Sequence, residues 1–150
     1  MGMRLSKILA QAIGVIVVLI AILAIAVSQL YAVRLCSNEL LKDVRVVTSG
    51  SGQFRIEFRG PLESVYSPVL VRSERIGERV EISIYKRLIV GPFAKMGFLR
   101  TPVSTDSVFE AIPQKTENGI LAAPLGTFGF SSPTFVLRTD LGVTPLPLSR

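Results

Sequence analysis

The pattern of apolar and polar positions divides the chain into two parts. Between Lys7 and Arg34 no side chain is charged, and residues 8–27 are almost wholly aliphatic. A run of about 20 apolar residues matches the roughly 30 Å hydrocarbon core of a bilayer. Because backbone amides in lipid must bond within their own segment, the run predicts one transmembrane α-helix that contacts the lipid bilayer through residues 8–27.

The apolar run has two interpretations, a retained anchor and a cleaved signal peptide. A cleavable signal has an apolar region of roughly 7–15 residues that ends at a small-x-small site, and residues 24–26 and 26–28 each fit such a site. The length of the run favours the anchor. Since Arg4 and Lys7 precede it, we expect a single-pass membrane protein with a cytoplasmic N-terminus and an extracytoplasmic C-terminal domain.

Beyond residue 44 the apolar positions recur at every second residue. Phe54, Ile56 and Phe58 are separated by charged residues. Val80, Ile82 and Ile84 are separated by one charged residue, Glu81, and one polar residue, Ser83. This alternation predicts two half-buried strands whose apolar sides face one core. It also predicts that the intervening charged residues, Glu57 and Glu81 among them, lie on solvated faces. The glycine-containing stretch after residue 48 predicts a hairpin between residues 44–48 and 54–58.

The remaining segments carry weaker signals. Residues 30–42 lack Pro and Gly, so the helix is expected to continue through them. Residues 65–71 predict an edge strand, or a strand that starts at Pro68, because proline cannot donate to a ladder. We expect the first four strands to form an antiparallel meander with one dry face. Shorter strands are expected within residues 104–112, 120–123 and 134–139.

Together these elements predict a mainly β chain. One N-terminal transmembrane helix precedes a small antiparallel β-sandwich or open β-barrel of about six to eight short strands. Residues 1–35 are expected to hold a cytoplasmic tip, the transmembrane anchor and a juxtamembrane helix. Residues 36–150 are expected to form the extracytoplasmic β domain.

The charge balance argues against nucleic acid as a partner. The formal net charge is +6, and Arg4, Lys7 and Arg34 beside the apolar run supply three of those charges. The later residues hold 14 Lys and Arg against all 11 Asp and Glu, and many of these charges are interleaved. A nucleic-acid surface needs clustered positive charge without acidic partners, so we expect no nucleic-acid binding.

Catalytic chemistry is poorly represented in the sequence. There is no histidine, so the commonest general base and most zinc sites are missing. Ser83 and Lys86 form an S-x-x-K pattern, but in a strand these two side chains point to opposite faces. We therefore expect no enzyme activity, no metal and no cofactor.

Cys36 is the single cysteine, so no disulfide within the chain is possible. Three interpretations stay open: a lipid-modified cysteine, a thiol that is reversibly acylated or bonded to a second chain, and a packed thiol. The residues Arg34 and Leu35 before it fit the first poorly, because lipid modification follows small residues. A packed thiol is the default.

Apolar residues in loop-like segments are the candidate contact residues. The stretch from residue 93 to 99 is expected either to fold over the open end of the core or to stay exposed. The residues predicted to contact a partner or ligand are Phe93, Met96, Phe98, Leu99, Phe128 and Phe130. We expect a membrane-anchored envelope protein whose β domain is a protein-interaction or complex-stabilising module. The alternative is a β-barrel carrier of a small apolar ligand or lipid, anchored or secreted, with the same phenylalanines lining its pocket.

Overall fold

The computed structural model describes residues 2–48, 53–60, 65–91, 101–128 and 133–149. Its first element is the helix α1 (Gly2–Leu30). The part Ile8–Leu30 is long and apolar enough to cross a membrane, since its mean hydropathy is 3.0 and the protein buries 0% of its most apolar window. The helix predicted from the apolar run is therefore confirmed.

The predicted continuation of this helix through residues 30–42 is wrong. α1 ends at Leu30, and the chain then forms the short strand β1 (Arg34–Leu35) and a 3₁₀ turn, η1 (Asn38–Leu40). β1 pairs with a long strand, and Cys36 directly after it is buried. Strand pairing and burial outweigh local helix propensity, which is only a weak prior.

The chain forms two compact units, Met1–Ala32 and Val33–Arg150. The second unit consists mostly of strands. After β1 these are β2 (Lys42–Thr48), β3 (Phe54–Arg59), β4 (Tyr66–Ile76), β5 (Arg79–Leu88), β6 (Val108–Ala111), β7 (Gln114–Lys115), β8 (Leu121–Pro124), β9 (Thr134–Thr139), β10 (Gly142–Pro145) and β11 (Leu148–Ser149). Three of the eleven strands in the described residues, β1, β7 and β11, have only two residues.

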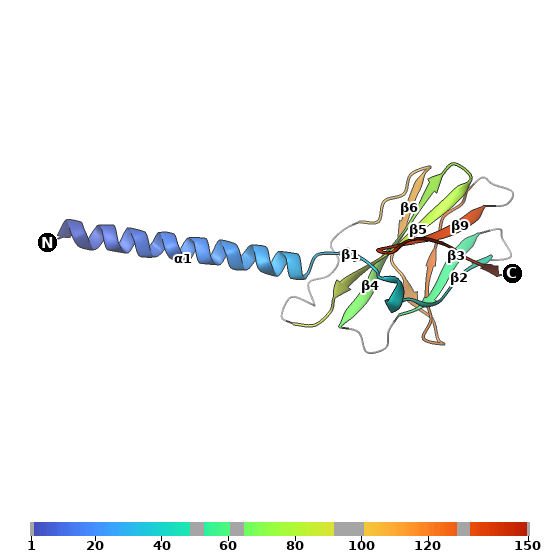
Figure 1. Cartoon of the computed structure of the whole chain (residues 1–150), viewed down its shortest axis with the longest axis horizontal. Helices are drawn as coiled ribbons and strands as arrows, with labels where there is room; N and C mark the ends of the chain where they lie inside the picture. The colour runs from blue at the N-terminus through green and yellow to red at the C-terminus, as the bar shows by residue number, and fades with distance from the viewer. Residues whose placement is uncertain (1, 49–52, 61–64, 92–100, 129–132, 150) are drawn as a thin grey trace. The chain divides into compact units, whose positions relative to one another are not determined.

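The strands form two sheets that pack against each other (Figure 1). The first sheet has the order β10-β9-β5-β4-β6, with β1 paired to β5, and the second has the order β11-β2-β3-β8-β7. Most neighbours are antiparallel, but β9 runs parallel to β5 and β11 runs parallel to β2. Neither sheet closes on itself. The predicted fold class, an apolar helix followed by a small β-sandwich, is confirmed.

The expected four-stranded meander is wrong. β2 pairs with β3, and β4 pairs with β5, as two antiparallel hairpins. The other neighbour of β3 is β8, and the other neighbour of β4 is β6, so the two hairpins belong to different sheets. Alternation shows which side of a strand is buried, but not which strand lies beside it.

β4 is longer than predicted and lies inside the first sheet. Its pairing with β5 is interrupted by a bulge between Pro68 and Leu70. β6 pairs with β4 only from Val71 to Glu74. In the described part of the chain β6 therefore does not pair with Pro68. A proline is tolerated at such a position because no neighbouring strand needs its missing N–H group.

The residues predicted to face inward form the centre of the core. Five of the six are 0% exposed: Ile56, Phe58, Val80, Ile82 and Ile84. Phe54, the sixth, is partly buried against the same cluster. Burial of each such side chain stabilises the fold by roughly 1.5–3 kcal/mol, so these residues hold the two sheets together.

The charged sides of the same strands are less solvated than predicted. The side chains of Glu57 and Glu81 are only 9% and 8% exposed. Arg45 donates to Glu57 at 2.8 Å, and Arg138 donates to Glu81 at 3.0 Å. Both arginines come from neighbouring strands, β2 and β9, and their side chains remain 49% and 60% exposed while the carboxylates that they bind are nearly buried.

Candidate functional site

Only one of the predicted contact residues can be placed. The other five lie outside the described residues: Phe93, Met96, Phe98, Leu99 and Phe130. Phe128 is 9% exposed and belongs to the hydrophobic core. It also lines a pocket of about 560 Å³. Phe128 is thus a core side chain with one side on a cavity, and the candidate site is the cavity that it borders.

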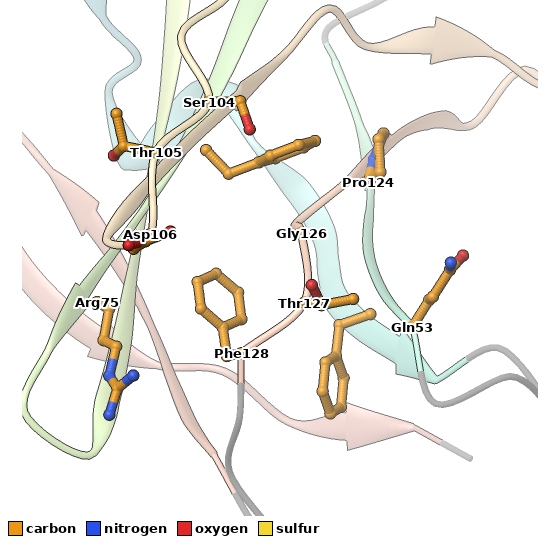
Figure 2. A pocket seen from close by; sticks show the side chains of 11 residues that line it. Gln53, Arg75, Ser104, Thr105, Asp106, Pro124, Gly126, Thr127 and Phe128 are labelled. Carbon is orange, nitrogen blue, oxygen red and sulfur yellow. The ribbon is translucent and has the colours of Figure 1, made fainter.

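The pocket lies between the two sheets at one end of the sandwich, which we call the pocket end. Arg75 on β4 and Phe109 on β6 line it from the first sheet, and Phe54 on β3 and Pro124 on β8 line it from the second. Figure 2 shows Arg75 and Asp106 on one side of the opening and Pro124 on the opposite side. The volume falls in the range of small-ligand sites, roughly 300–1,000 Å³.

Backbone hydrogen bonds fix the wall that carries Asp106. The N–H of Arg75 donates to the carbonyl of Ser107 at 2.7 Å, which ties the turn to β4. The Thr105 hydroxyl accepts from the N–H of Val108 at 3.0 Å, and the N–H of Thr105 donates to the carbonyl of Val108 at 2.7 Å. The closed turn presents one acidic side chain at the mouth, next to the strand end that carries the basic one.

The opposite wall depends on Gly126. Its φ is +82°, and a Cβ added there would lie 3.0 Å from Cγ of Phe109. A side chain would meet backbone strain and a packed ring together. The preceding residue, Leu125, donates its N–H to the carbonyl of Phe54 at 3.0 Å and accepts from the hydroxyl of Ser73 at 2.8 Å. Because Ser73 lies on β4, the second bond joins the two sheets beside the pocket.

Aromatic rings form the apolar part of the pocket. The ring centroids of Phe54 and Phe135 are 4.9 Å apart at an interplanar angle of 57°. Figure 2 shows the ring of Phe128 pointing toward the centre of the pocket. Rings below a polar mouth suit an apolar group that carries hydrogen-bonding atoms at its edge. Among the described lining residues Asp106 is the single carboxylate and Arg75 is the single basic side chain.

Cys36 lies outside this pocket, where its N–H donates to the carbonyl of Ile84 at 2.7 Å. The thiol is free and buried. Burial raises the pKa of the Cys36 thiol to about 11, and the positive charge of Lys86 opposes that shift in part. A buried, protonated thiol is a poor nucleophile, which favours the packed-thiol interpretation. Within the described ranges, no three His, Cys, Asp or Glu side chains lie close enough together to hold a metal ion.

Comparison with known proteins identifies no relative. No protein family matches the chain, no curated protein matches it, and no solved structure matches it.

Proposed function

We propose that this chain is a single-pass membrane protein whose β-sandwich binds another protein, or stabilises a membrane complex, in the cell envelope. α1 supplies the anchor because Ile8–Leu30 is long and apolar enough to span the hydrocarbon core. Arg4 and Lys7 precede this span, and positive residues near a span favour the cytoplasmic side. The sandwich then lies outside the cytoplasm. Recovery of residues 1–7 by mass spectrometry of the membrane-bound chain tests retention of the anchor.

The residues at the pocket end are the main support for a binding function. Its mouth presents Arg75 and Asp106, and its interior presents the rings of Phe54, Phe109 and Phe128. An open cavity with a few convergent polar groups above apolar walls is typical of a binding site. Aromatic side chains and arginine are also enriched at protein interfaces. We propose that the occupant is an apolar side chain that protrudes from a protein partner.

The packing of the sandwich favours this contact over the carriage of an apolar ligand. A carrier needs room between its sheets for most of the ligand surface. Here the side chains of Ile56, Phe58 and Ile82 fill the interior and are 0% exposed. The pocket lies beyond them at the end of the sandwich, where it can receive part of a partner without enclosing it.

A photo-crosslinking amino acid at Thr127 tests the contact in native membranes. Thr127 lines the pocket and is exposed, so a probe there reaches an occupant without replacing a core side chain. The matched control is the same probe at Glu117, an exposed turn residue between β7 and β8. We expect a discrete cross-linked product from the Thr127 position and none from the Glu117 position.

A pair of charge changes decides whether the product depends on the pocket. Asp106→Lys reverses the charge at the mouth, and Glu117→Lys makes the same change in the control turn. We expect several-fold less product from the first variant and an unchanged amount from the second, at equal melting temperatures. Equal products from both probes, or a product insensitive to Asp106→Lys, would refute the pocket as the contact site.

A further inference from the structure

The other end of the sandwich, where the chain enters the β unit, has a different surface. β1 pairs with the last part of β5, with Arg34 opposite Lys86. The N–H of Ile89 donates to the carbonyl of Val65 at 2.8 Å, so the chain just after β5 lies beside the chain just before β4. Three segments far apart in sequence therefore meet here. We call this the entry end.

Apolar side chains remain exposed at the entry end. Four of them, between 38% and 48% exposed, come from the three segments and form what we call the entry patch: Val33, Val65, Ile89 and Val90. Single exposed apolar residues are normal on a protein surface. Several that are brought together by strand pairing mark a contact site for a protein or a membrane.

Basic side chains accompany the entry patch. Arg34, Lys86 and Arg87 lie on the paired ends of β1 and β5. The ammonium group of Lys86 lies 5.1 Å from the ring centroid of Tyr66. Asp140 is an acid whose charge reaches Cys36, the residue directly after β1. Aliphatic, tyrosine and basic side chains together are typical of protein surfaces at a membrane–water interface.

The chain itself keeps the entry end near any bilayer that α1 spans. The candidate span ends at Leu30, and β1 begins at Arg34. Four residue steps extend at most about 14 Å. The polar layer on each side of the hydrocarbon core is roughly 5–8 Å deep. The first strand of the sandwich must therefore start in this layer or just above it.

We propose that the entry end docks on the surface of the bilayer that holds α1, with the entry patch in the headgroup layer and Arg34, Lys86 and Arg87 against anionic lipid headgroups. The proposal rests on the membrane anchor proposed above. Docking removes exposed apolar surface from water and places basic groups at a negative surface. Because β4 and β5 run from one end of the sandwich to the other, docking also turns the pocket end away from the membrane, toward a partner.

Lipid quenching of a fluorescent label tests the docking on the full chain reconstituted in vesicles. Ile89→Cys places the label in the entry patch, and Glu78→Cys places it in the β4–β5 turn at the pocket end. The unsubstituted chain reports any labelling of the buried Cys36. One set of vesicles contains phosphatidylcholine alone, and the other contains phosphatidylcholine and phosphatidylglycerol in equal parts; both contain spin-labelled lipid.

We expect several-fold stronger quenching of the Ile89 label than of the Glu78 label, and stronger quenching in the anionic vesicles. Lys86→Glu with Arg87→Glu should reduce quenching in anionic vesicles to the level found in neutral ones. Added salt should do the same to the chain without the charge changes, because it screens surface charges, so the test does not depend on the folding of that variant.

Two failures have different meanings. If the chain does not float with the vesicles, the membrane anchor itself is wrong. If the chain floats but the Ile89 label is quenched no more than the Glu78 label in anionic vesicles, the docking is wrong and the entry patch is left for a protein partner. Quenching of the Ile89 label that is equal in neutral and anionic vesicles overturns the role given to the anionic headgroups.

Discussion

The two ends of the sandwich hold their apolar side chains in opposite ways. At the pocket end the rings of Phe54, Phe109 and Phe128 are partly or fully buried, and apart from Pro124 the exposed lining residues are polar or charged. At the entry end the aliphatic side chains are themselves exposed, and basic groups flank them. The first surface can select an occupant by shape, whereas the second is suited to a broad, fluid surface. One small sandwich thus presents two kinds of surface, and the same two strands connect them.

The strands β4 and β5 make the comparison testable because each reaches both ends. Their register runs from Tyr66 opposite Leu88 to Ile76 opposite Arg79. The bulge between Pro68 and Leu70 lies in the half toward the entry end. Two amides report on the ends separately: the Cys36 amide, bonded to Ile84, for the entry end, and the Leu125 amide, bonded to Phe54, for the pocket end.

The largest effect is expected from a substitution in the core of β5, the strand that reaches both ends. Ile82 lies midway along β5 and is 0% exposed. Ile82→Ala leaves a cavity and should lower the free energy of unfolding by about 2–5 kcal/mol. Denaturant unfolding measures the loss, and hydrogen exchange should show the Cys36 and Leu125 amides losing protection together. In the control, Leu141→Ala, the side chain is 78% exposed, so the change should stay within about 0.5 kcal/mol. Loss of protection at one amide only would mean that the ends unfold independently.

The second effect is confined to the pocket end. Gly126→Ala combines a left-handed backbone, which costs about 1–2 kcal/mol, with a close contact to Phe109, which costs about 1–3 kcal/mol. We expect a loss of about 2–5 kcal/mol and faster exchange at the Leu125 amide than at the Cys36 amide.

Gly77→Ala is the matched control for this change. Gly77 also has a positive φ, +63°, but an added Cβ finds nothing within 4 Å. Only the backbone cost of about 1–2 kcal/mol should remain. Equal losses at the two glycines would mean that Phe109 moves freely and that the pocket wall is not tightly packed.

The sequence predicts those features that depend on neighbours along the chain. An unbroken apolar run predicts α1, and alternation at residues 54–58 and 80–84 predicts the inward side of two strands. The glycine-containing stretch after residue 48 predicts the hairpin of β2 and β3. The parallel pairing of β9 with β5 joins residues more than 50 positions apart, and no local pattern marks it. The burial of Glu57 and Glu81 escapes prediction for the same reason, because the arginines that bind these two carboxylates come from neighbouring strands.

The candidate site was harder to predict than the fold. The sequence predicts Phe128 at a contact with a partner or ligand. In the structure Phe128 lines the pocket, but as part of the core. Its polar neighbours Arg75 and Asp106 come from separate segments that meet only after the sheets assemble. The one local signal is Gly126, two residues before Phe128, since a glycine beside a strand often marks a close approach of the backbone.

The smallest expected effect concerns Cys36 and sharpens the comparison at the entry end. The pKa of its thiol is about 11 in the folded chain against an ordinary value of 9.0. Above pH 9 the unfolded chain loses this proton while the folded chain keeps it, so the stability contributed by the neutral thiol is lost as the pH rises from about 9 to about 11. The free energy of unfolding, measured between pH 9 and pH 11, should therefore fall more steeply with pH for the unsubstituted chain than for Cys36→Ala.

Thiol labelling near neutral pH also tests whether Cys36 is buried and protonated. Cys36 should react with a maleimide far more slowly than a cysteine introduced at the exposed Glu117, because the reagent needs an accessible thiolate. Ile82→Ala should speed labelling of Cys36, since it loosens both ends, whereas Gly126→Ala should speed it less. Labelling of Cys36 at the rate of the exposed control would show that the entry end opens readily, and the contrast between the two ends would then lie in their dynamics rather than in their surfaces.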